Sequence, residues 1–199
     1  MTTETQTPPK KPRLTSAFQH LMSIHWWMAW CYLFLFISGY GIVHAIPNQS
    51  ALLAPGYDFH KSMGVLVMAL VTWRVFVLLR VWWKKYTRRS PRLTPQWWRK
   101  VILHTLLYIF MWAVPITGFY LSNSFRSNNV KFFGLLLPDF FPQNQAALPV
   151  ASQFHFWFAY SFLALIIRHT LQQWKVVKAL WRRFSQTLQR HTAKILPPS

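Results

Sequence analysis

Four apolar segments, each about as long as a membrane helix, constrain the fold of this chain more than any other feature. They lie at residues 22–44, 60–82, 101–122 and 153–174. A helix needs about 20 mostly apolar residues to cross a hydrocarbon core about 30 Å thick. Within that core the backbone N–H and C=O groups find partners only in helices or closed barrels. The sequence therefore predicts an all-α integral membrane protein, a four-helix bundle whose helices run alternately up and down.

The charged residues are few and almost all basic. The chain has 199 residues, 22 of them Lys or Arg against three Asp or Glu, and a net charge of +19. Such an excess can indicate binding of nucleic acid. Here the basic residues flank the apolar segments, as they do in membrane proteins. We therefore expect a partnership with membrane lipid and none with nucleic acid.

The distribution of Lys and Arg predicts the orientation. Basic residues gather before the first segment, between the second and third, and after the fourth, whereas the other two connections hold only Arg126 and Lys131, with Lys61 at a segment edge. The positive-inside rule then places both termini in the cytoplasm.

The apolar segments, with the polar stretch before them and the basic stretch after them, divide the chain into three parts. These are a disordered cytoplasmic N-terminus (1–19), a transmembrane domain (20–175) and a basic amphipathic cytoplasmic tail (176–199). The aromatic connection 123–152 is expected to form a short interfacial helix on the outer face.

Five histidines near the ends of the apolar segments point to a cofactor. His155 and His169 are fourteen residues apart in the fourth segment. They share a helix face and are separated by about 21 Å along its axis, so one lies near each side of the membrane core. The other three segments carry His25, His60 and His104. Ionisable side chains in a membrane bundle are costly and are therefore functional candidates.

The alternating helix directions assign a depth to each of these histidines. His60 and His155 fall near the outer face, and His25, His104 and His169 near the inner face. A haem iron with two histidine ligands takes one imidazole from each of two helices. The sequence therefore predicts two haems stacked across the membrane, the outer one held by His60 and His155. The inner one is held by His169 and either His25 or His104, a choice that spacing leaves open.

Three further residues predict how such haems are bound. The only cysteine, Cys31, excludes a CxxCH attachment, so each haem is a non-covalent haem b. Gly64 follows His60 by four residues on the same face and leaves room for a flat porphyrin. Arg74 follows His60 by fourteen residues, and a buried guanidinium there would pair with a haem propionate.

Several short stretches, in this order and spacing, resemble those of a known family. They are SIHW at His25, HKSMG at His60, LHTLLYIFMWAVPITGFYLS around His104, the spacing of His155 and His169, and the position of Arg74. Over about residues 20–175 the chain resembles the bacterial cytochrome b561 family, four-helix di-haem b proteins of the bacterial inner membrane.

The resemblance implies that His25 and His169 hold the inner haem and that His60 and His155 hold the outer one. It also implies electron exchange with ubiquinone and, as in one characterised member, oxidation of superoxide coupled to ubiquinone reduction. His104 would then be free to contact a propionate or to protonate reduced quinone at the cytoplasmic side.

The outer-face cations suggest how a small reductant could be attracted. Lys61, together with Arg126 and Lys131, would draw an anion such as superoxide to the periplasmic face by Coulombic steering. A periplasmic redox protein is the other possible donor. The sequence thus predicts a transmembrane electron carrier and oxidoreductase acting on quinone.

Two other functions compete with this interpretation. The chain could be a cytochrome b subunit that anchors a larger respiratory dehydrogenase or hydrogenase. It could also be a cofactor-free transporter, proton channel or adaptor. Proton relays usually use buried carboxylates, and none of the acids Glu4, Asp58 and Asp139 lies inside a predicted segment, which disfavours a relay.

Overall fold

The computed structural model describes residues 13–86 and 93–195 and is almost entirely helical. The long helices are α1 (Arg13–Tyr40), α2 (Leu53–Tyr86), α3 (Pro95–Phe125), α4 (Leu148–Gln172) and α5 (Trp174–Ile195). The short elements are the π-helical turn η1 (Gly41–Ala45), the strands β1 (Lys131–Phe132) and β2 (Leu135–Leu136), and the 3₁₀ turn η2 (Gln145–Ala147). The predicted all-α fold class is confirmed.

Four helical stretches are long and apolar enough to cross a membrane. They are Gln19–Ala45, Leu53–Trp83, Pro95–Phe125 and Gln145–Gln172. Large apolar side chains such as Trp27, Phe76 and Trp157 are exposed on the outside of the bundle. A surface of this kind suits lipid tails, which are as apolar as the side chains themselves.

The helices extend further than the sequence analysis expected. Because α1 begins at Arg13, residues 13–19 are helical, which differs from the disordered N-terminus predicted for 1–19; residues 1–12 lie outside the described part of the chain. Because α2 begins at Leu53, Asp58 lies inside a candidate membrane span, although it lies outside the predicted segment 60–82. Asp58 is close to the N-terminal end of that span, and its side chain is still 42% exposed.

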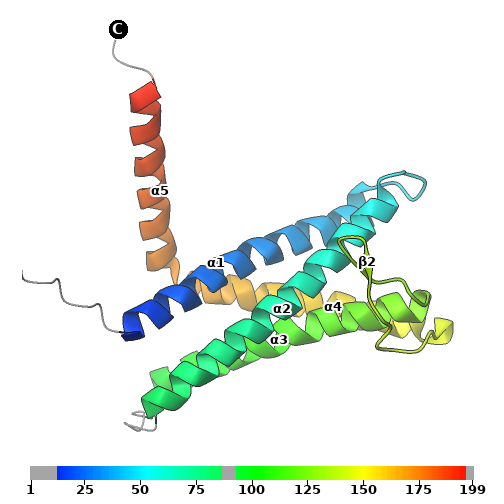
Figure 1. Cartoon of the computed structure of the whole chain (residues 1–199), viewed down its shortest axis with the longest axis horizontal. Coiled ribbons are helices and arrows are strands. Elements are labelled where there is room, and N and C mark those ends of the chain that lie inside the picture. The colour runs from blue at the N-terminus through cyan, green and yellow to red at the C-terminus, as the bar shows by residue number, and fades with distance from the viewer. Residues whose placement is uncertain (1–12, 87–92, 196–199) are drawn as a thin grey trace, which may run out of the picture.

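The four membrane helices pack in chain order (Figure 1). Helix α2 contacts α1 and α3, and α3 contacts α4, whereas no Cα atoms of α1 and α4 within the described residues approach within 8 Å. Aromatic side chains bridge the wider spacing between those two helices. The rings of Tyr32 and Phe162, for example, meet at a centroid distance of 4.8 Å.

Helix α3 continues through Pro115, and a neighbouring helix replaces the hydrogen bond that the proline removes. A proline has no N–H, so the carbonyl four residues earlier, that of Met111, loses its helical partner. The hydroxyl of Tyr32 on α1 donates to this carbonyl at 3.3 Å. Membrane bundles tolerate proline where a neighbouring helix satisfies the freed carbonyl in this way.

The connection between α3 and α4 forms a hairpin rather than the expected interfacial helix. Strands β1 and β2 pair antiparallel through a two-residue turn at Phe133 (φ 46°) and Gly134 (φ 95°). Two positive φ angles match the right-handed twist of a tight hairpin, and glycine adopts them without strain. The hairpin packs against the N-terminal end of α2 (Figure 1).

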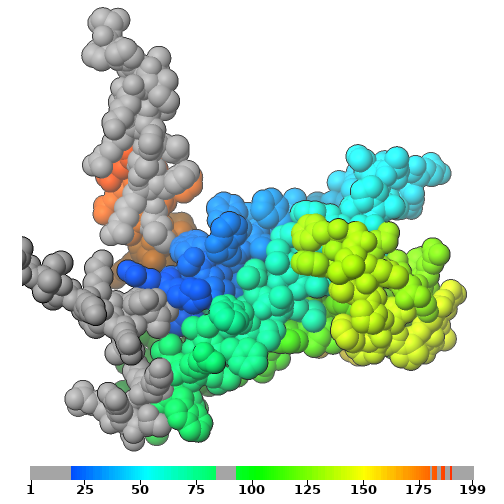
Figure 2. Space-filling view, in the orientation of Figure 1, coloured from blue at the N-terminus to red at the C-terminus, as the bar shows by residue number. Residues whose placement is uncertain are grey.

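Helix α5 leaves the bundle at the opposite end from the hairpin (Figure 1). It follows a single non-helical residue, Gln173, and in the space-filling view its described part stands clear of the four-helix body (Figure 2). The last residues of the predicted tail, 196–199, lie outside the described residues.

Candidate functional site

The two histidines predicted to lie near the outer face, here named the outer pair, meet across the bundle. His60 on α2 and His155 on α4 have ring centroids 6.3 Å apart and ring planes at 89°. An imidazole nitrogen lies about 2 Å from a transition metal, so two imidazoles on opposite sides of one iron have centroids roughly 6 Å apart. The observed separation therefore fits one iron atom between the two rings.

Hydrogen bonds orient both outer imidazoles. Nδ1 of His155 lies 3.2 Å from the carbonyl of Val114 and 3.2 Å from the hydroxyl of Thr117. Nδ1 of His60 lies 3.0 Å from the hydroxyl of Ser38, which itself donates to a backbone carbonyl. Because a carbonyl only accepts, Nδ1 of His155 carries the hydrogen, and the same assignment suits His60. Nε2 of each ring then keeps a lone pair, and a ring whose other N–H is bonded in this way has the usual arrangement of a metal-binding histidine.

Two glycines that the sequence analysis did not assign to the site lie against these rings. A Cβ added to Gly39 on α1 would lie 3.1 Å from Cε1 of His60, and one added to Gly118 on α3 would lie 3.1 Å from Cε1 of His155. Both helices can approach the imidazoles this closely only because no side chain intervenes. Gly64, which was assigned to the site, has no atom within 4 Å of its Cβ position, so the face that it shares with His60 is open.

All three inner histidines lie together, at different separations. His25 on α1 and His169 on α4 have centroids 6.3 Å apart, as in the outer pair, whereas His104 on α3 is 5.2 Å from His169. His25 and His169 are partly buried, and His104 is exposed. Nδ1 of His104 donates to the carbonyl of Lys100 at 2.6 Å. Nδ1 of His169 is buried and has no hydrogen-bond partner among the described residues.

Arg74 lies at the inner end of α2 and links three helices. Its Nε donates to the hydroxyl of Tyr108 on α3 at 2.9 Å, and its Nη1 donates to the carbonyl of Leu21 on α1 at 3.0 Å. A guanidinium has five N–H donors, so Arg74 keeps donors for an anion while these two contacts hold it in place.

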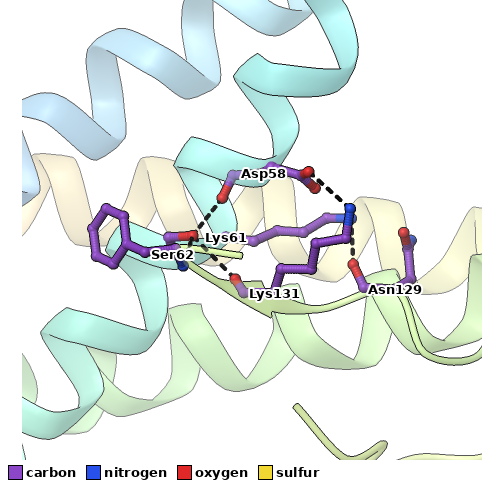
Figure 3. Close-up of polar contacts among 6 residues, drawn as sticks. Asp58, Lys61, Ser62, Asn129 and Lys131 are labelled. Atoms are coloured by element: carbon purple, nitrogen blue, oxygen red, sulfur yellow. Dashed lines mark hydrogen bonds and ion pairs between the residues drawn. The ribbon is translucent and has the colours of Figure 1, made fainter. Parts of the chain in front are cut away.

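Two of the three cations predicted near the outer face, Lys61 and Lys131, already have partners within the protein (Figure 3). The ammonium of Lys61 donates to the carbonyl of Asn129 at 3.0 Å, and that of Lys131 pairs with the Asp58 carboxylate at 3.2 Å. Arg126 is exposed. These three cations outnumber the two carboxylates of this end of the bundle, Asp58 and Asp139, so its charge is still positive. The pairing with Asp58 was missed because the two partners are far apart in the sequence.

The serine that follows Lys61 fastens the hairpin to the same end of α2. The hydroxyl of Ser62 lies 2.7 Å from the carbonyl of Asp58 and 3.0 Å from that of Lys131, and it accepts from the backbone N–H of Phe133 at 3.0 Å (Figure 3). The hairpin is therefore fastened to α2 at a residue two positions after His60 in the sequence.

One comparison with known proteins finds a match for this chain. The family model described as prokaryotic cytochrome b561 matches residues 20–185, which include all four membrane helices. No curated protein and no solved structure matches the chain. A b-type haem iron can take two histidine nitrogens from a protein, and the separation of the paired imidazoles fits this arrangement. The chain therefore belongs to the prokaryotic cytochrome b561 family: it is a multi-pass membrane protein that binds b-type haem and transfers electrons across the membrane.

Proposed function

We propose that this cytochrome holds two b haems, one near each face of the membrane, and carries electrons between a donor at the outer face and ubiquinone. One observation carries the proposal: two separate histidine pairs, His60 with His155 and His25 with His169, have the same centroid separation of 6.3 Å. The two histidines of α4 are fourteen residues apart, so the pairs lie about 21 Å apart along that helix.

The geometry of the inner site favours His25 over His104 as the partner of His169. A separation of 5.2 Å is shorter than two imidazoles on opposite sides of an iron require, whereas 6.3 Å matches the outer pair. His104 is also exposed and already bonded to the carbonyl of Lys100.

Each neighbouring residue has a role in holding the haems, which supply the one-electron chemistry when bound. Ser38, Thr117 and the Val114 carbonyl keep Nε2 of the outer histidines available. Arg74 would bind a propionate with its remaining donors, and the open face at Gly64 would receive the porphyrin.

His104 is the candidate proton donor to quinone. Reducing a quinone to a quinol takes two electrons and two protons, and the protons must come from a group near the inner site. With Nδ1 donating to Lys100, Nε2 of His104 is free to hold and release a proton. For this role His104 must lie at the cytoplasmic face of the bacterial inner membrane, and both chain termini then lie on that side as well. The distribution of Lys and Arg favours the same orientation.

At the outer face we propose that the donor is a small anion, with superoxide as the chemically simplest case. Superoxide loses one electron to become O₂, and the electron passes to the outer haem. The net positive charge at the hairpin end of the bundle, where Lys61, Arg126 and Lys131 outnumber Asp58 and Asp139, supports this donor class.

Haem counting in purified histidine variants tests the two-haem proposal. We expect two haems per chain from absorption spectra taken before and after dithionite. His60→Ala and His155→Ala should remove the outer haem and largely spare the inner one, and His25→Ala should remove the inner haem. His104→Ala serves as the matched control: it should keep both haems and slow quinone turnover.

Two results would count against the assignments. A folded wild-type protein with one haem would end the two-haem proposal. Loss of the inner haem in His104→Ala but not in His25→Ala would exchange the roles of these two residues.

A further inference from the structure

The four helices share a seven-residue register that places three side-chain layers across the membrane. Seven residues on an α-helix return to nearly the same face about 10 Å further along the axis. The aligned sets are His25, Tyr32 and Gly39 on α1; His60, Val67 and Arg74 on α2; His104, Met111 and Gly118 on α3; and His155, Phe162 and His169 on α4. The outer and inner sets contain the histidines, and the middle set contains none.

The middle layer, defined as Tyr32, Val67, Met111 and Phe162, is closely packed. Phe162 and Val67 are fully buried, and Tyr32 is 5% exposed. The ring of Tyr32 meets that of Phe162 edge-on at 4.8 Å, and its hydroxyl reaches the carbonyl of Met111. All four membrane helices therefore contribute to one layer midway between the two histidine pairs.

Two more aromatic rings extend this layer around Phe162. Phe110 lies parallel to Phe162 at a centroid distance of 6.5 Å, and Phe36 lies at 6.2 Å. The only side-chain polar group of the middle layer, the Tyr32 hydroxyl, is already bonded. A buried water needs two to four polar partners, and this layer does not offer them.

We propose that the middle layer is a dry partition between the two haem sites. The Phe162 ring is the residue that keeps this layer closed to water. The inference rests on the two-haem function proposed above. Phe162 is seven residues from both His155 and His169, so its ring is a neighbour of both sites without being a ligand in either. The partition keeps the two sites apart and keeps the medium between them apolar.

The partition has an electrostatic consequence for both sites. A ferric bis-histidine haem centre carries one more positive charge than the ferrous centre, and an apolar surrounding disfavours the more charged form. The Phe162 ring packs against Tyr32, so removing it would leave a cavity beside Tyr32, where a water could bond the Tyr32 hydroxyl and the Met111 carbonyl that the ring now shields. The more charged form would then be better solvated, and both midpoint potentials would become more negative.

The experiment compares Phe162→Ala with Phe156→Ala in the full-length protein, in samples already shown to hold two haems. Phe156 is on the same helix but exposed, so its truncation controls for loss of an aromatic ring. We expect a redox titration followed by absorption to show both potentials lowered in Phe162→Ala and unchanged in Phe156→Ala. Phe162→Leu, which keeps most of the apolar volume, should show a smaller shift of the same sign.

The other outcomes are equally decisive. Unchanged potentials in a Phe162→Ala protein with two haems, or a shift of one haem only, would overturn the partition. If Phe162→Ala fails to assemble, Phe162→Leu takes its place in the test. Unchanged potentials in this variant, or a shift of one haem only, would then overturn the partition. Loss of haem from the leucine variant as well would overturn the proposal, because an apolar partition should accept another apolar side chain. A wild-type protein without two haems would instead refute the function on which the inference rests, and it would be recognised before any variant is compared.

Discussion

At the scale of single residues, the outer site depends on the absence of side chains as much as on the imidazoles. Gly39 and Gly118 lie so close to His60 and His155 that even a methyl group would press on a ring. Hydrogen bonds from Nδ1 hold both rings and limit how far they can turn away. These two glycines therefore help to set the position of the two imidazoles.

Alanine substitution of these glycines should disturb the outer haem. Alanine is favoured over glycine inside a helix by up to about 1 kcal/mol, so Gly39→Ala and Gly118→Ala would raise stability if nothing opposed them. We expect instead a lower occupancy of the outer haem or a changed ligand-field spectrum, because Cβ would lie 3.1 Å from Cε1 of His60 or His155.

Electron paramagnetic resonance and the haem-to-protein ratio measure this effect. The control is Gly41→Ala, where the added Cβ meets no atom within 4 Å. An outer-haem signal identical to that of the wild type in both ring-facing variants would show that the histidines move aside freely.

At the scale of secondary-structure elements, α1 and α3 depend on one another through a proline. Pro115 frees the carbonyl of Met111, and the Tyr32 hydroxyl on α1 satisfies it. An unpaired carbonyl in an apolar core is unfavourable, so this bond joins two helices that otherwise make no close backbone contact among the described residues.

A double-mutant cycle should reveal the coupling between these two residues. Removing the hydroxyl in Tyr32→Phe should lower the free energy of unfolding by about 1 kcal/mol. In Pro115→Ala the restored N–H can bond the Met111 carbonyl, so Tyr32→Phe should cost less in that background. Unfolding of the purified protein by denaturant in mixed micelles provides the four free energies. Equal costs of Tyr32→Phe in both backgrounds would mean that the hydroxyl does not serve this carbonyl.

At the scale of the whole molecule, positive charge is present at both ends of the bundle, and the two groups of charge suit different binding partners. At the hairpin end it is a small, partly neutralised group beside the outer histidines. At the other end it continues into α5, where Lys175, Lys178 and Arg182 are exposed. The first suits a small diffusing anion, and the second suits an extended anionic surface.

Steering by the outer charges should make the reaction with superoxide sensitive to salt. We expect the rate of haem reduction by superoxide to fall as ionic strength rises, and Lys61→Gln to slow it at low salt, because each reduces the attraction of an anion. Rapid-mixing spectrophotometry follows the reaction, and Lys178→Gln at the other end of the molecule is the control. A rate indifferent to both salt and Lys61→Gln would exclude steering by this face.

For α5 we propose that the helix lies on the anionic cytoplasmic leaflet, as the predicted tail (176–199) implies. Basic side chains near such a surface each contribute about 1 kcal/mol to binding. Backbone amide exchange in α5 should therefore be slower in nanodiscs of anionic lipid than in zwitterionic ones, and high salt should remove the difference. Lys178→Gln combined with Arg182→Gln should weaken it. Exchange that is the same in both lipids would show that α5 does not bind the surface.

Much of the architecture follows from the chain alone, because a membrane narrows the possibilities. Hydrocarbon admits only helices or closed barrels, so apolar length was enough to locate four helices. Their alternating direction was enough to assign histidines to two depths. The pair formed by His60 and His155 could be anticipated for the same reason, since that depth held no other histidine.

Lateral arrangement could not be read in this way, because it depends on how each helix is rotated and which helices are neighbours. Spacing along α4 says nothing about whether His25 or His104 lies 6.3 Å from His169. Nor does it show that Gly39 and Gly118 meet imidazoles of other helices. The hairpin also escaped prediction, because its docking uses contacts to Ser62, about seventy residues away in sequence. Contacts between distant segments form only when the helices pack, so they were decided by the tertiary structure.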